Sequence, residues 1–145
     1  MTFRYQGYPV RGIDGTMTQV YRPTIPLRVI GPTGGSMVFG LLDTGADDTL
    51  LPDRLLGLLG VGIGPDARIP VWGIGGGTVA ADFGAIGLQL RGHRWSATAG
   101  FYSGNRVLLG HSGFLEHFGA SFNGVARTVR LRIVGHLPVP INPTD

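Results

Sequence analysis

The sequence contains no cysteine, and its 12 basic residues are all arginine, so lysine is absent as well. Without cysteine there is no disulfide, no thiolate metal site and no thiol nucleophile. Without lysine, the chain can build neither a Walker A loop, which needs Gly-Lys-Ser/Thr at the phosphates, nor a Schiff-base enzyme. These two absences exclude several catalytic classes before any motif is considered.

Charged residues are scarce too, at 14% of 145, and the longest apolar stretch, residues 55–64, is too short to span a bilayer. The first residues lack the apolar core of a signal peptide. We therefore expect a single soluble domain in the cytoplasm, without a membrane partner. The net charge is only +3 and the arginines are scattered, so no nucleic-acid partner is expected. The group Arg127, Arg130 and Arg132 is interpreted as a solvated strand face.

Glycine and short apolar runs are abundant instead. The chain has 26 glycines, and hydrophobic residues make up 43% of it, which is enough for a core with many turns. The dipeptide Asn123-Gly124 predicts a hairpin turn, and two short helices are predicted at 52–59 and 112–118. The predicted strands are 24–30, 37–42, 79–83, 85–90, 94–101, 107–109 and 128–134. Short strands at this spacing indicate an all-β barrel or sandwich.

Three acidic residues follow one of these apolar runs within six positions: Asp43, Asp47 and Asp48. A carboxylate that leaves a buried strand at a Thr-Gly turn is a candidate general acid or base. The alternative is a purely structural Asx turn that ends the strand at Asp43.

Residues 41–49, Leu-Leu-Asp-Thr-Gly-Ala-Asp-Asp-Thr, resemble the active-site signature of the retropepsins, the retroviral-type aspartic proteases. Other parts of the family pattern follow in order. Arg22-Pro23 precedes the first barrel strand, and the glycine-rich segment 72–79 is similar to the flap. Leu-Leu-Gly at 108–110 and the segment 114–118 are similar to the element and helix near the end of the domain.

The resemblance covers residues 22–134 and divides the chain into three parts. Residues 1–21 are expected to be an N-terminal extension able to form strands, and residues 135–145 a Pro-rich tail. The implied fold is all-β: a closed acid-protease barrel, single-domain and retropepsin-like, with one short C-terminal helix. The implied activity is that of an aspartic endopeptidase on polypeptide substrates.

The resemblance also assigns roles to single residues. It implies that Asp43, Thr44 and Gly45 are catalytic and that a flap at 69–83 covers the substrate. It implies no cofactor and no metal ion, and the four histidines lack metal-ligand spacing. The implied substrate-binding residues are Ala46, Asp47, Asp48, Ile74, Gly75, Gly76 and Gly77.

One chain supplies only half of such a site. Aspartic proteolysis needs two carboxylates that share one proton, and the sequence contains a single Asp-Thr-Gly. We therefore expect a homodimer in which Asp43 of each chain meets at the two-fold axis. The alternative is a catalytically silent peptide-binding or dimerisation module with the same fold.

Further pairings are implied by the resemblance alone. The Thr44 hydroxyl would lock the two active-site loops together. In retroviral members the residue at the position of Asp47 pairs with two arginines. Arg22 keeps the first of them, and His111 stands at the second, a departure that would make this pairing pH-dependent or weaken it and leaves open whether His111 pairs with Asp47. Segment 127–134, and less strongly 3–10, would supply strands to the dimer interface.

Overall fold

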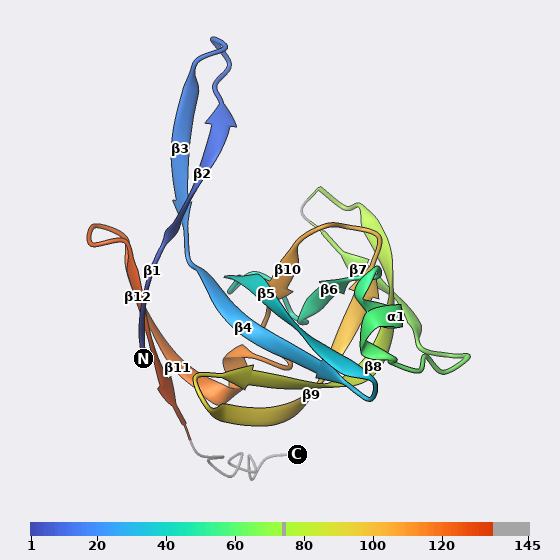
Figure 1. Cartoon of the computed structure of the whole chain (residues 1–145). Coiled ribbons are helices and arrows are strands. Elements are labelled where there is room, and N and C mark those ends of the chain that lie inside the picture. The colour runs from blue at the N-terminus through green and yellow to red at the C-terminus, as the bar shows by residue number, and fades with distance from the viewer. Residues whose placement is uncertain (74, 135–145) are drawn as a thin grey trace, which may run out of the picture.

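The computed structural model describes residues 1–73 and 75–134, and its strands form three sheets (Figure 1). None of the described helices is long and apolar enough to cross a membrane. In chain order the elements are β1 Thr2–Arg4, β2 Gln6–Arg11, β3 Met17–Arg22, β4 Thr24–Gly31, β5 Gly34–Leu42, β6 Leu50–Pro52, α1 Leu55–Leu59, β7 Arg68–Trp72, β8 Thr78–Leu90, β9 His93–Tyr102, β10 Val107–Leu109, a 3₁₀ turn η1 Leu115–His117, β11 Phe118–Asn123 and β12 Thr128–Ile133.

The seven-stranded sheet closes on itself. Its order is β4-β5-β10-β6-β9-β8-β7, and β4 also pairs with β8, with Val29 opposite Leu88. Alternate side chains of these strands point inward. The core includes Ile25, Leu27, Val29, Leu51, Leu88, Leu90, Phe101 and Leu109, all almost completely buried. The predicted all-β closed barrel is thus confirmed.

Two predicted strands, 79–83 and 85–90, are in fact one strand, β8. Gly84 lies between them and does not interrupt the strand. A Cβ at Gly84 would lie 2.6 Å from Cγ1 of Val61. This glycine therefore allows the 61–63 loop to approach the strand closely, and the division of this stretch into two strands was wrong.

The predicted helices are shorter than expected. Pro52 is the last residue of β6, so the first helix, α1, begins only at Leu55; it ends at Gly60, which has φ 65°. The predicted helix at 112–118 is reduced to the 3₁₀ turn η1. Gly113 has φ 89°, outside the helical region, so a helix cannot run on from residue 112. The chain then turns extended at Phe118 and forms β11, a strand that the sequence analysis missed.

The two ends of the described chain meet in the sheet β1-β12-β11. The β11–β12 hairpin exists as predicted, but Asn123 pairs with Thr128, so its loop has four residues rather than two. The Asn123 side chain accepts the Ala126 N–H (2.8 Å), and the positive φ falls on Arg127. The third sheet is the hairpin β2–β3, which projects from the barrel at the blue end of the chain (Figure 1).

Candidate active site

Asp43 is the first residue after β5, at the point where β5 runs parallel to β10. Its main-chain N–H donates to the Leu109 carbonyl (3.2 Å), which continues the pairing of the two strands. The Asp43 side chain is half-buried, and its Oδ1 accepts the Gly45 N–H (2.9 Å). The carboxylate is thereby oriented by the turn that follows it, while part of it stays open to solvent.

The rest of the loop 43–49 lies against the chain segment that follows β10. The His111 N–H donates to the Ala46 carbonyl (2.9 Å), and the Ser112 N–H donates to the Asp47 carbonyl (2.8 Å). The Thr49 N–H donates in turn to the Ser112 carbonyl (3.1 Å). These hydrogen bonds are between main-chain groups, so they do not depend on the side chains of the loop. The position of Asp43 is therefore fixed by two segments that are about 65 residues apart in sequence.

Gly110 makes this contact possible. A Cβ at Gly110 would lie 2.6 Å from the Asp48 carbonyl carbon and 2.7 Å from the Ala46 carbonyl oxygen. No side chain fits there. The glycine of the Leu-Leu-Gly element therefore serves to let two backbones touch.

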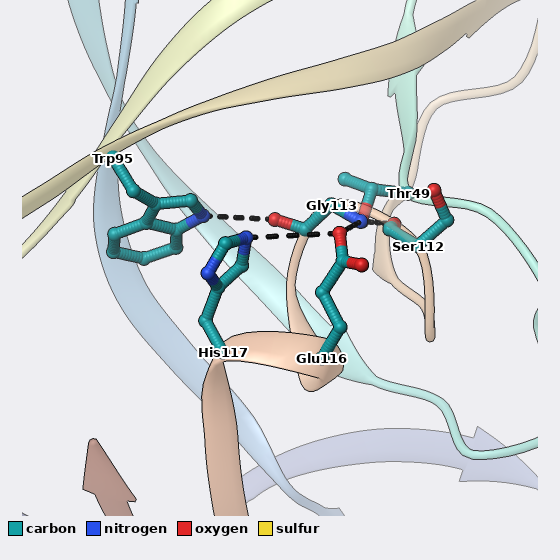
Figure 2. A network of polar contacts seen from close by, with 6 residues as sticks. All are labelled: Thr49, Trp95, Ser112, Gly113, Glu116 and His117. Atoms are coloured by element: carbon teal, nitrogen blue, oxygen red, sulfur yellow. Dashed lines mark hydrogen bonds and ion pairs between the residues drawn. The ribbon is translucent and has the colours of Figure 1, made fainter. Parts of the chain in front are cut away.

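Behind the loop lies a network of polar contacts (Figure 2). The fully buried Thr49 donates its hydroxyl to the Ser112 carbonyl (2.8 Å). Next to it, the Trp95 indole N–H donates to the Gly113 carbonyl (2.9 Å), and Glu116 accepts the Gly113 N–H (2.7 Å). The Trp95, Gly113 and Glu116 contacts stiffen the segment that supports the loop, and the sequence analysis did not identify them.

Trp95 also belongs to an aromatic cluster. The centroid of its ring lies 5.7 Å from that of Phe114, 5.3 Å from that of Phe118 and 5.5 Å from that of His117. His117 Nε2 is in turn 3.6 Å from Glu116 Oε1. The only local signal for this arrangement is the density of aromatic residues at 114–118, and that segment was predicted to be part of a helix.

The remaining predicted loop residues lie at the surface. The Thr44 hydroxyl has no hydrogen bond within the described part of this single chain, while Thr44 and Asp47 are exposed and Ala46 and Asp48 half-buried. In this single chain the His111 ring contacts a different group from Asp47: its Nε2 lies 2.8 Å from the Thr44 carbonyl oxygen.

Arg22 also departs from the expectation. In the described residues it forms no ion pair with Asp47, and its guanidinium lies over the Tyr8 ring, 5.5 Å from the centroid. Arg22 therefore contacts an aromatic ring of the N-terminal hairpin in place of the carboxylate that the resemblance implies.

The segment predicted as a flap is a β-hairpin formed by β7 and β8. Trp72 is opposite Thr78, and the turn between them is closed by the Gly73 N–H, which donates to the Gly77 carbonyl (2.8 Å). Gly75 and Gly76 have φ 91° and 79°. Ile74 lies outside the described residues. No hydrogen bond or ion pair joins the described residues of this turn to the loop 43–49.

A groove of about 470 Å³ lies beside β5, between the N-terminal hairpin and the barrel. It does not include any residue of the loop 43–49. No group of three or more potential metal ligands occurs in the described part of the chain. The groove is lined mainly by Tyr8, Arg22, Met37, Phe39, Arg54 and Arg106.

No protein-family model and no curated protein sequence matches the chain. The chain does match solved structures, among them the following two. One is the EIAV protease in complex with an inhibitor: TM-score 0.49, 21% identity, 62% of this chain and 82% of that chain covered. The other is a retropepsin-like aspartic protease from Rickettsia conorii: TM-score 0.46, 18% identity, 89% and 94% covered. The fold of this chain itself is an all-β closed barrel with Asp-Thr-Gly directly after β5.

Proposed function

We propose that this chain is one half of an aspartic endopeptidase that acts as a homodimer and hydrolyses peptide bonds in extended polypeptides. The observation that carries the proposal is the support of Asp43: a half-buried carboxylate, oriented by the Gly45 N–H, on a loop bound through its backbone to a second segment. A reacting group must be held in place if its geometry is to favour the transition state.

In the proposed reaction, the ionised Asp43 of one chain takes a proton from a water molecule. The protonated Asp43 of the other chain donates a hydrogen bond to the scissile carbonyl oxygen while the water oxygen attacks the carbonyl carbon. The tetrahedral intermediate then collapses: the C–N bond breaks, and a proton passes from the carboxyl pair to the leaving nitrogen. No metal ion or cofactor enters this sequence.

The proposal gives roles to the other loop residues. Thr44 and Asp47 are exposed and have no side-chain partner among the described residues of the single chain, so both are available to a second chain or to substrate. Gly45 leaves room for the substrate backbone, and Ala46 and Asp48 line the path beside it. The hairpin of β7 and β8, with Gly75, Gly76 and Gly77 at its turn, would close over the peptide and exclude water.

The test is cleavage of a peptide library by the wild-type chain and by Asp43→Asn, which keeps the shape of the side chain but removes its ionisable group. Turnover should fall by roughly 10³-fold or more, with dimerisation and the circular dichroism spectrum unchanged. The matched control is Asp66→Asn, an equivalent change at an exposed aspartate in the 61–67 loop, which should leave turnover unchanged.

Retained cleavage by Asp43→Asn, after contaminating proteases are excluded, would assign the chemistry to other residues. Peptide binding by the wild-type chain without cleavage at any pH would favour the silent binding module instead. Two neighbouring carboxyls cannot both ionise at low cost, so the proposed enzyme has a bell-shaped rate profile on the acid side. A rate that rises steadily into alkaline pH contradicts the shared proton.

A further inference from the structure

The hairpin of β2 and β3, residues 6–22, is here called the arm. Its strands pair from Gln6 opposite Arg22 to Arg11 opposite Met17. The arm points away from the barrel, and its attachment is at its base (Figure 1). There the Tyr5 N–H donates to the Arg127 carbonyl (2.8 Å), and the Arg127 guanidinium lies 3.7 Å from the centroid of the Tyr21 ring.

The turn of the arm is well defined. The Thr16 hydroxyl and N–H both donate to the Asp14 carboxylate, at 2.7 and 3.0 Å, and these bonds lower the pKa of Asp14 below its ordinary value of 3.8. The Gly12 N–H also donates to the Thr16 carbonyl (2.7 Å). The arm is therefore built as a defined hairpin up to its tip.

A lone two-stranded hairpin is only marginally stable in water, because neither face is covered and both edges are unpaired. The arm nevertheless exposes apolar side chains: Met17 is 61% exposed, Val20 40% exposed, and Ile13 at the tip is fully exposed. Its only charged residues are Arg11, Asp14 and Arg22. Such a hairpin is typical of a segment that is completed by another molecule.

One face of the arm is suited to this role. Cross-strand neighbours share a face, and Tyr8 is opposite Val20 while Val10 follows two residues after Tyr8. These three side chains form a continuous strip, here called the apolar strip; Tyr8 and Val10 are half-buried, and Arg22 lies over the Tyr8 ring at the base. The other face has the polar Gln19 opposite Pro9 at its centre, and its exposed Met17 lies opposite the charged Arg11.

The position of the arm identifies what covers the strip. The arm ends at Arg22, and the next residue, Pro23, accepts the N–H of Leu42 (2.9 Å), the residue directly before Asp43. A second Asp43 must come next to this one if the carboxylate pair is to form, which is the one point at which this inference rests on the proposed function. The second copy then lies within reach of the arm, since strands of six residues extend about 20 Å.

We propose that the arm binds a second copy of this chain through Tyr8, Val10 and Val20. By two-fold symmetry each copy extends its own arm and receives the other. The arm thereby stabilises the assembly that completes the carboxylate pair.

The test is the dimer dissociation constant, measured by analytical ultracentrifugation for the full-length wild type and two variants. Val20→Asp places a charge in the apolar strip and should weaken the dimer by about tenfold or more, since a buried valine contributes at least that much. Gln19→Asp introduces the same charge one residue away on the opposite face, and should change the constant by less than about threefold. Equal effects of the two variants would overturn the proposal.

A second measurement requires no substitution. Hydrogen exchange of residues 6–22 in the wild-type protein should slow as the protein concentration rises through the dissociation constant, because the covered arm is protected only in the dimer. Exchange in the arm that does not depend on protein concentration overturns the proposal, as does protection of the arm by lipid vesicles or another protein instead of a second copy.

These experiments separate the arm from the chemistry. If Val20→Asp weakens the dimer but the wild type cleaves no peptide, the proposed function fails and the role of the arm stands. If the wild type cleaves peptides and Val20→Asp dimerises as well as Gln19→Asp, the role of the arm fails and the proposed function stands.

Discussion

The loop 43–49 and the glycine-rich turn 73–77 were both predicted to touch substrate, and they are built in opposite ways. Four main-chain hydrogen bonds join the loop to residues 109–112. The described residues of the turn are bonded only within their own hairpin, and a Cβ added at Gly75, Gly76 or Gly77 would meet nothing within 4 Å.

The difference shows that glycine does two kinds of work in this chain. Gly110 is required because two backbones touch at that point, whereas Gly76 is required because its φ is 79°. A loop that is hydrogen-bonded through its main chain to a second segment suits a carboxylate that must keep its position. A turn with open space around it suits an element that must admit a polypeptide.

The largest expected effect comes from filling the contact beneath the loop. Gly110→Ala forces a methyl group against the Asp48 and Ala46 carbonyls, and should lower the free energy of unfolding by about 3 kcal/mol. Gly57→Ala is the control, because Gly57 lies in α1 with open space around it and alanine favours a helix. Denaturation at one fixed protein concentration compares them, and equal stability of the two variants would show that the loop is not held as described.

Straining the turn should lower catalysis as well as stability. Gly76→Val puts a β-branched residue at φ 79°, which costs about 1 to 2 kcal/mol, and should lower kcat/KM about tenfold. Gly92→Val is the matched control: Gly92 has φ 86° and open space, but lies in the turn between β8 and β9. It should cost similar stability and leave kcat/KM within about twofold. An equal loss of kcat/KM in both variants would remove the turn from the substrate site.

A smaller effect is expected from removing one hydroxyl behind the loop. Thr49→Val deletes the hydroxyl bond to the Ser112 carbonyl but keeps the main-chain bond to the same atom, so stability should fall by only about 1 kcal/mol. Thr24→Val is the control, because Thr24 is also buried and its hydroxyl makes no hydrogen bond within the described residues. Thermal unfolding at fixed concentration measures both. A loss in Thr24→Val as large as in Thr49→Val would show that the hydroxyl bond is not the cause.

The smallest effect is expected at the base of the β7–β8 hairpin. Arg68 and Asp82 form an ion pair at 3.5 Å, with the arginine largely exposed. Arg68→Gln should change the free energy of unfolding by less than about 0.5 kcal/mol, and high salt should abolish the difference. A larger, salt-independent loss would mean that Arg68 stabilises the base of the hairpin through contacts other than this exposed ion pair.

Much of the fold was predictable from the sequence because short apolar runs with turn residues between them specify strands locally. The strand before Asp43 and the last strand, β12, lie within a few residues of their predicted bounds. The errors arose where the role of a residue depends on more than its sequence neighbours. Gly84 separates two apolar runs in the sequence, but in the structure it allows a close contact with Val61. Gly113 prevents a helix because its φ is 89°.

The candidate site divides in the same way. The position of Asp43 after an apolar run is a local signal, whereas its support comes from a segment about 65 residues further along the chain. The His111 contact with the Thr44 carbonyl depends on how that segment packs, which spacing alone does not encode. The arm was predicted only as an extension, since nothing local shows that a hairpin will project from the barrel.

The central claim is that two chains make one site, and the stoichiometry of a tight inhibitor tests it most directly. A statine-type peptide, which mimics the tetrahedral intermediate, can be titrated into the protein calorimetrically, with its sequence taken from the preferred cleavage site. We expect one peptide bound per two chains, and no binding by Asp43→Asn at the same concentrations. One peptide bound per chain, by a protein that remains monomeric and active on dilution, would contradict the account.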